Sequence, residues 1–543
     1  MRFSSTQQPI FQLPRLRRCV FVYIFLIILL LLKSNQYAAA QQTQSTGKMD
    51  EIIKLIKKNY VDSVNVDSIV HSLVADFLNK PSTIDSLFSK LDPHSSYMNK
   101  AYYSQFKRNI ENKLVGIGIE FTIVHDTAIV VNVLSGGPAE KAGLKTGDKI
   151  IKINDDIIPK KDLPFDDIIA KLIGEKETHV KITVQRNKPA DLFPVEIIRD
   201  TVALKSVLAS YIIAKGTGDI LISYFAKSTA AEVHESLREL NRLGMKKLIL
   251  DLRDNPGGLV RAAVSIADEF LAADKLIVSE KGRDSNSSAE YAKTPGLFEN
   301  GEMIVLINES SGSAAEILAA ALQDNKRAKM IGRRSYGKGL VQLLYPLSDS
   351  GSAIKLTVAR YYTPSGKCIQ RPFDKGMGAY LNDYHERVKN NGEITGTSQA
   401  SAAIQWGVQP DLYVPDDTTS GSKLFNQLYL NYYISGAAYY YYATNPAMLN
   451  EYNSPEEFKK KYRIDNKLFD ELKKYTASED LKIKDSKQRL IYKDADFNSI
   501  QSKLELAMKA FIAREKWKNE GLYYILNEGD ADINTAIKEL QAK

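Results

Sequence analysis

The feature that most constrains this chain is a serine at the junction between an apolar strand and an apolar helix. Residues 303–307 form a continuous apolar run, which predicts a buried strand, and from Ile317 onward apolar residues recur at helical spacing. Ser313 lies between the two runs, so we expect it at the N-terminal end of a helix. Free backbone N–H groups and the helix dipole favour developing negative charge at such a position.

Ser313 has two interpretations that the residues alone leave open. Ser313 and Glu316 have the spacing of a capping box, in which two side chains satisfy the first backbone donors of a helix. That role is purely structural. A serine nucleophile would instead need a base, because its hydroxyl is weakly nucleophilic until the proton is taken, and Lys338 is the nearby candidate.

Lys338 also has a competing interpretation. The spacing of Gly332, Gly337 and Lys338 is nearly that of a phosphate-binding P-loop. The next residue, however, is Gly339 rather than the serine or threonine that would hold Mg²⁺. Residues 340–345 also read as a strand, whereas a P-loop must open a helix. The sequence therefore disfavours nucleotide binding.

Four motifs in this chain resemble those of the C-terminal processing, or tail-specific, serine peptidases, and they occur in family order over roughly residues 50–415. The motifs are Leu91-Asp92-Pro93-His94-Ser95, Asp251-Leu252-Arg253-Asp254-Asn255-Pro256-Gly257-Gly258, Ser311-Gly312-Ser313-Ala314-Ala315-Glu316-Ile317 and Tyr336-Gly337-Lys338-Gly339-Leu340-Val341-Gln342. The resemblance implies that Ser313 is the nucleophile, that Lys338 is its base, and that Gln342 is an amide that orients the lysine. Many members have more serines around the nucleophile than this chain, but Ser313 itself is in place.

The same resemblance implies an oxyanion hole. In the family, one backbone N–H comes from the turn that here contains Gly257 and Gly258, and the other comes from the residue after the nucleophile, which is Ala314. Each such donor is worth about 3–4 kcal/mol of transition-state stabilisation. Taken without the resemblance, residues 254–258 read equally well as a plain turn from a strand into a helix.

Residues 112–200 change to short alternating strands, and the run 137–150 makes this region resemble a PDZ domain. Such a domain binds an extended C-terminus as an added strand, and a glycine-containing loop captures the terminal carboxylate with backbone N–H groups. That loop corresponds here to Gly116, Ile117, Gly118 and Ile119. The alternative is that the glycines only permit a tight turn.

The first forty residues read as a targeting segment. A basic stretch with Arg15, Arg17 and Arg18 precedes an apolar run at 19–32, and residues 38–40 are small, so we expect cleavage after Ala40. The apolar run is shorter than the about 20 residues that a membrane span needs, although an uncleaved anchor is an alternative. Removing five basic residues and no acid lowers the formal charge from +8 to +3, so the charge gives no argument for nucleic-acid binding.

The fold class predicted is multidomain α+β, with an α/β peptidase core of the tail-specific type. The expected parts are a signal peptide at 1–40, an N-terminal helical region at 41–111, a PDZ domain at 112–201, a serine peptidase core at 202–415 and a C-terminal helical region at 416–543. Within the later parts, residues 383–401 read as a polar loop or insertion. The tyrosine cluster of Tyr429, Tyr432, Tyr433 and 439–442 reads as a packed helix. The mature chain would keep one cysteine, Cys368, and hence no internal disulfide.

The predicted function is an exported, periplasmic or cell-envelope serine endopeptidase that selects protein substrates by their C-termini and cleaves them through an acyl-enzyme. Lys338 can act as a base only when neutral, and free lysine titrates near 10.4, so burial has to lower its pKa. No cofactor and no metal are expected, since His234 lacks the second histidine of a zinc-protease helix. Membrane contact is expected only through an uncleaved leader, and a homo-oligomer stays open. The alternative function is a catalytically silent PDZ adaptor.

Overall fold

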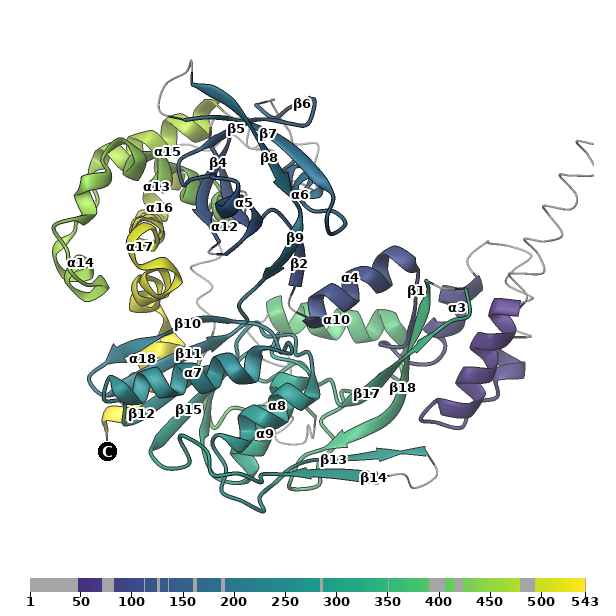
Figure 1. Cartoon of the computed structure of the whole chain (residues 1–543). Coiled ribbons are helices and arrows are strands. Elements are labelled where there is room, and N and C mark those ends of the chain that lie inside the picture. The colour runs from purple at the N-terminus through teal and green to yellow at the C-terminus, as the bar shows by residue number, and fades with distance from the viewer. Residues whose placement is uncertain are drawn as a thin grey trace, which may run out of the picture. The chain divides into compact units, whose positions relative to one another are not determined.

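The computed structural model describes residues 47–70, 83–111, 113–124, 127–134, 136–159, 164–186, 191–283, 287–349, 351–389, 406–415, 423–430, 432–478 and 494–542 (Figure 1). The predicted leader at 1–40 lies outside these residues. The chain divides into two compact units, residues 1–103 with 342–357, and residues 104–341 with 358–543, and each is described by itself. No helix in the described part is both long and apolar enough to span a lipid bilayer.

The first unit has a small helical core closed by a strand pair. Residues 47–59 and 66–70 are helical, and α3 (Thr83–Ser89), β1 (Ser96–Met98) and the start of α4 (Lys100–Glu111) follow. β1 pairs antiparallel with the first half of β18 (Ala353–Tyr362). Asp92 joins the two chain segments, because its carboxylate accepts hydrogen bonds from the Ser95 hydroxyl at 2.5 Å and the Thr357 hydroxyl at 3.1 Å. The motif around His94 is thus organised by a buried aspartate.

The predicted PDZ region of the second unit is a sheet wrapped around one apolar core. Its strand order is β3-β4-β5-β7-β8 with β6 on β5, and the separate pair β2–β9 encloses the region in sequence. The elements are β2 (Lys113–Gly116), β3 (Ile119–Val124), β4 (Thr127–Val133), α5 (Pro138–Lys141), β5 (Lys149–Ile153), β6 (Asp156–Ile157), α6 (Phe165–Leu172), β7 (His179–Gln185), β8 (Leu192–Ile198) and β9 (Asp200–Ala203). The fully buried Val130, Ile150 and Ile182 show how alternating apolar residues of these strands build that core.

The core of the second unit is a largely parallel sheet with the order β10-β11-β12-β15-β16-β19, in which only the β10–β11 pair is antiparallel. Its strands are β10 (Val207–Ala214), β11 (Thr217–Ile222), β12 (Lys247–Asp251), β15 (Glu302–Ile307), β16 (Lys329–Gly332) and β19 (Leu412–Tyr413), and the helices between them are α7 (Thr229–Arg242), α8 (Val260–Asp268) and α9 (Ala314–Asp324). Central strands covered on both faces read as continuous apolar runs, as the sequence indicated for 303–307.

Helices cover both faces of this sheet (Figure 1). Leu248, Leu250 and Val305 pack in one apolar cluster with α7, α8 and α9. Ile249 and Ile304 point to the opposite face, where they pack with Ile533 and Leu540 of α18 (Ala531–Gln541). The last helix of the chain is therefore part of the core of this sheet.

The C-terminal helical region has its own apolar core, which includes the fully buried Leu428, Phe458 and Leu504. Its elements are α12 (Lys423–Leu430), α13 (Tyr433–Thr444), η3 (Pro446–Leu449), α14 (Pro455–Lys461), α15 (Asn466–Ser478), α16 (Asp494–Ser499), α17 (Gln501–Leu526) and η4 (Asn527–Gly529). The predicted packed helix is confirmed for Tyr433 and the tyrosines at 439–442, which lie on α13 with Tyr439 buried. Tyr429 instead lies on α12, and Tyr432 precedes α13.

A second sheet of this unit pairs β13 (Leu276–Gly282) with β14 (Ser287–Tyr291) and with the second half of β18. β17 (Leu340–Pro346), which belongs to the first unit from Gln342 onward, also pairs with β18.

The predicted polar loop at 383–401 is wrong for residues 383–389, which belong to α10 (Gly376–Lys389). The rest of that segment lies outside the described residues. Tertiary contacts stabilise this polar helix. Tyr380 is buried, the Arg371 guanidinium lies 3.7 Å from the centre of its ring, and Arg371 also pairs with Asp383 at 2.9 Å. None of these contacts is visible in the local polarity pattern.

Candidate active site

Ser313 is held in a strained conformation at the sharp turn between β15 and α9. It caps the helix with φ 56° and ψ −115°, a region that residues other than glycine rarely adopt. Strain of this kind costs about 1–3 kcal/mol and persists only where the surroundings impose it, which is most often at functional sites. Ser313 as a whole residue is 9 % exposed, and the first N–H groups of α9 lie directly after it.

Glu316 joins the Ser313 turn to the loop that carries Lys338. Its fully buried carboxylate accepts from the N–H of Ser313 and the N–H of Lys338, both at 2.8 Å and both on Oε2. The other oxygen accepts from the Ser335 hydroxyl at 2.5 Å and the Gly337 N–H at 2.6 Å. Burial raises the pKa of Glu316, while these four hydrogen bonds oppose that rise. Glu316, the second member of the predicted capping box, thus also anchors the backbone of both Ser313 and Lys338.

The loop that bears Lys338 is fixed by close backbone packing. Gly337 has φ 87°, and a Cβ there would lie 2.8 Å from side-chain atoms of Arg371 and Trp406. The Arg371 N–H donates to the Gly337 carbonyl at 2.9 Å, and the Gly339 N–H donates to the Gln370 side chain at 2.9 Å. Lys338 is half-buried in this loop. Its backbone position is therefore set on both sides by glycines that no larger residue could replace without movement.

The turn with Gly257 and Gly258 lies against the Ser313 turn. The Gly312 N–H donates to the Asn255 carbonyl at 2.9 Å. A Cβ on Gly257 would lie 2.7 Å from the Ser313 Cβ and 2.9 Å from the Ala314 nitrogen. Gly257 is therefore required for the approach of the two turns. The structure brings Gly257, Ser313 and Ala314 together.

The two glycines differ in what their N–H groups do. The Gly257 N–H donates to the Asn255 side-chain oxygen at 2.9 Å, and Asn255 is itself fully buried. Within the described ranges, no hydrogen bond engages the Gly258 N–H. A Cβ on Gly258 would lie 2.1 Å from the Phe225 carbonyl oxygen, so this residue also has to be glycine.

Gln342 lies on β17, in the first of the two compact units. Its side-chain nitrogen is buried and has no hydrogen-bond partner within the part of the chain that the structure describes. Buried amide donors are usually satisfied, so a buried one without a partner needs an explanation. Its arrangement toward Lys338 stays a prediction.

The predicted carboxylate loop lies between β2 and β3 of the PDZ region. The carbonyls of Ile117 and Gly118 accept from the Ala139 and Leu134 N–H groups at 2.7 and 3.0 Å. Nothing in the described structure accepts a hydrogen bond from the N–H of Ile117 or Gly118. Gly118 has φ 79°, which places two consecutive donors on a turn that favours glycine.

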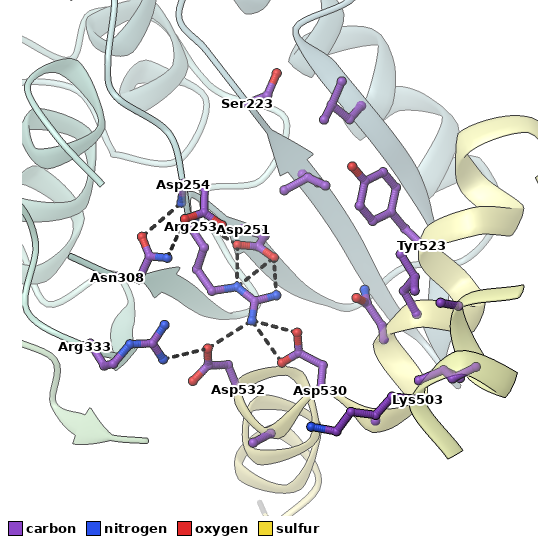
Figure 2. Close-up of a pocket in the computed structure, with 18 of the residues that line it drawn as sticks. Ser223, Asp251, Arg253, Asp254, Asn308, Arg333, Lys503, Tyr523, Asp530 and Asp532 are labelled. Atoms are coloured by element: carbon purple, nitrogen blue, oxygen red, sulfur yellow. Dashed lines mark hydrogen bonds and ion pairs between the residues drawn. The ribbon is translucent and has the colours of Figure 1, made fainter. Parts of the chain in front are cut away.

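A charged network beside the site was not expected from the sequence. Figure 2 shows Arg253 surrounded by carboxylates of three residues, with the shortest contacts at 2.6 Å to Asp251, 2.7 Å to Asp530 and 3.0 Å to Asp532. Burial alone would lower the pKa of Arg253, but the carboxylates outweigh it and hold that pKa well above the usual value. Asp530 caps α18, so the network attaches the last helix to the motif that begins at Asp251.

These residues line a cavity of about 520 Å³. Ser313 and Lys338 are not among its lining residues, so the cavity is not the predicted catalytic site. Asn308 and Asp254 connect it to the Ser313 turn, since the Asn308 amide donates to the Asp254 carboxylate at 2.9 Å. Arg253 belongs to a family motif and was visible in the sequence, whereas its partners near residue 530 carry no local signal.

Family models match three parts of the chain. Residues 216–376 match peptidase family S41, residues 115–197 match the PDZ domain, and residues 424–518 match a family of unknown function, DUF8443. A carboxy-terminal-processing protease of Bartonella bacilliformis is 37% identical over 53% of this chain and 66% of its own length. A probable CtpA-like serine protease of Staphylococcus aureus is 33% identical over 60% of this chain and 62% of its own length.

The chain thus has a region that matches peptidase family S41 and a region that matches the PDZ domain, and it is similar to C-terminal processing serine peptidases. Its match spans just under two thirds of the length of these two relatives. A solved structure of the photosystem II D1 C-terminal processing protease is 24% identical, with a TM-score of 0.39, and covers 68% of this chain and 92% of that one.

Proposed function

We propose that this protein is an exported serine endopeptidase with a Ser313–Lys338 dyad. The observation that supports it best is the shared anchor, because one buried carboxylate oxygen of Glu316 binds the backbone N–H of both residues. A structural helix cap would need only the bond to Ser313. Export rests on the basic and apolar pattern of residues 1–40, with cleavage after Ala40.

In this proposal, the neutral Lys338 amine takes the proton of the Ser313 hydroxyl, and the Ser313 oxygen attacks the substrate carbonyl. Negative charge then develops on the carbonyl oxygen. The Ala314 N–H and one N–H from Gly257 or Gly258 stabilise it. The Gly258 N–H has no hydrogen-bond partner among the described residues and can donate directly, whereas the Gly257 N–H must first leave Asn255. The amine leaves with the proton from Lys338, and water hydrolyses the acyl-enzyme. Gln342 orients the lysine.

The experiment that tests this function is degradation of a denatured protein by the purified chain, with no nucleotide and no metal added. We expect cleavage under these conditions, and neither ATP nor a chelator should change its rate. A silent adaptor would leave the substrate intact while still binding it. Activity that EDTA abolishes and zinc restores would contradict the dyad.

We also propose that the PDZ domain selects substrates by their C-termini at Gly116, Ile117, Gly118 and Ile119. An added strand gains affinity from main-chain hydrogen bonds along β3, while the terminal carboxylate gains from the N–H groups of Ile117 and Gly118. Protein substrates are the partners that follow from this arrangement.

An apolar-ended peptide should bind the Ser313→Ala protein at least a few-fold more tightly as the free acid than as the amide. Amidation removes the charge, and hydrogen bonds to charged groups contribute about 1.5–3 kcal/mol. Gly118→Val should weaken the free acid by a similar factor, since Gly118 has φ 79° and a Cβ there would lie 3.3 Å from Val202. Fluorescence titration measures both effects. Equal affinities for the acid and the amide would exclude recognition of the terminal carboxylate by the PDZ domain, whether or not the protein is an active peptidase.

A further inference from the structure

The strip along β3 where an added peptide strand would lie, which we call the peptide groove, has two chemically different ends. β3 is an edge strand, with β4 as its partner in the sheet, and α6 contacts it through the rings of Phe165 and Phe121. The carboxylate loop lies at the C-terminal end of α6, because a Cβ on Gly116 would lie 3.5 Å from the Leu172 carbonyl oxygen. Phe165 is the first residue of α6 and so marks the far end, where its ring stacks on Phe121 of β3 at 4.5 Å between ring centres.

The distance between the two ends sets which peptide residue would reach Phe165. Seven helical steps from Leu172 to Phe165 span about 10 Å at 1.5 Å per residue. A strand advances about 3.3 Å per residue, so the same length corresponds to about three peptide residues. A substrate tail bound by its carboxylate would therefore meet Phe165 with the residue about three positions before its last one.

Tyr432 of the helical region covers this far end of the groove. Its ring stacks on the Phe165 ring, with centres 4.3 Å apart and planes 23° from parallel. Phe165 is thus held between Phe121 of β3 and Tyr432, which immediately precedes α13. Tyr432 has φ 65°, which is uncommon for a residue other than glycine and shows that its surroundings impose this conformation.

The helical region also binds the outer face of the same edge strand. Arg514 of α17 pairs with Glu120 of β3 at 2.5 Å. Tyr439 of α13 packs against Ile129 of β4, and both are 6 % exposed. Thr122 lies two residues from Glu120 and opposite Ile129, so it is on this face, and it is buried. The helical region therefore contacts the outer face of β3 and β4. Through Tyr432 it also contacts Phe165 at the far end of the peptide groove.

We propose that the region matched by the family of unknown function is an intramolecular partner of the PDZ domain that limits how far a peptide can enter the groove. A tail of about three residues fits beside Tyr432, and a longer tail must displace Tyr432 from Phe165. The inference rests on the proposed reading of C-termini by this domain. It assigns to residues 424–518 a role in substrate selection.

Two peptides with the same apolar C-terminus, three and ten residues long, test the proposal in the full chain carrying Ser313→Ala. Adding Tyr432→Ala should tighten binding of the long peptide at least about five-fold and leave the short peptide unchanged. Tyr440→Ala is the matched control, because this tyrosine of α13 is 38 % exposed, close to the 40 % of Tyr432. A long peptide that binds Tyr432→Ala equally or more weakly would overturn the proposal and make Tyr432 part of the binding wall.

Hydrogen exchange separates this inference from C-terminal reading. Arg514→Glu places a like charge against Glu120, so amides of β3 and of the start of α13 should exchange faster. Combining it with Glu120→Arg restores opposite charges and should return exchange to the parent rate. Unchanged exchange in Arg514→Glu would overturn the docking. Faster exchange combined with equal binding of acid and amide peptides would support the docking and reject C-terminal reading.

Discussion

Replacing Ser313 by alanine should reduce cleavage of a denatured substrate by at least about 10³-fold, because the acyl-enzyme cannot form without the hydroxyl. Lys338→Ala should have an effect of the same order, because the loss of either member of a catalytic pair removes most of the activity that the pair provides. Circular dichroism and the urea midpoint should stay near those of the parent. The Ser313 hydroxyl is not required for the Glu316 anchor, which binds the Ser313 backbone N–H.

Two further variants sharpen this test. Lys338→Arg keeps the positive charge and most of the side-chain length but cannot act as a base, so it should be as inactive as Lys338→Ala. Ser310→Ala is the serine control and should keep most activity, because the Ser310 hydroxyl bonds to the Tyr384 hydroxyl at 3.0 Å. Full activity of Ser313→Ala, prepared from a host without interfering proteases, would refute the nucleophile. Full activity of Lys338→Arg would leave Lys338 only a positioning role.

Replacing Arg253 by methionine should destabilise the second unit by about 3–5 kcal/mol, because it leaves buried carboxylates without their cation. Asp251 and Asp532 are buried. Burial raises the pKa of Asp532, although the positive charges of Arg253 and Arg333 oppose that rise. We expect a lower urea midpoint and faster hydrogen exchange in α18, whose capping residue is Asp530. Backbone amides at 531–541 should exchange faster before the strands of the sheet open.

Arg238→Met is the matched control for this stability change. Arg238 is an exposed arginine of α7 that pairs with Glu235 at 3.4 Å, and exposed pairs of this kind contribute at most about 1 kcal/mol. Its urea midpoint should stay close to that of the parent. If Arg253→Met were as stable as Arg238→Met, the buried network would not hold the last helix to the sheet.

The local patterns in the sequence were sufficient for the elements that carry the site. The apolar run at 303–307 became β15, and the helical spacing after Ser313 became α9. The alternating strands of the PDZ region and the strand after Lys338 also formed as expected. These features depend on side chains a few residues apart, which is the range that periodicity and turn chemistry report.

The segment at 383–389 shows where such patterns fail. It is polar and was expected to be a loop, yet it is helical because Tyr380 and Asp383 bind a buried arginine from outside the helix. Local polarity measures the cost of burying a side chain, but it carries no information about a partner that compensates that cost.

The sequence by itself determined the peptidase and PDZ resemblance, the residues proposed for catalysis and their elements. Only the tertiary structure decided what surrounds them. Glu316 reads as a helix cap in the sequence, and folding makes it the common anchor of Ser313 and Lys338. Arg253 meets Asp530, which lies 277 residues further along the chain, and Tyr432 meets Phe165 of a different domain. Contacts over such separations depend on how whole elements pack, because no spacing rule relates residues that only the folded core brings together.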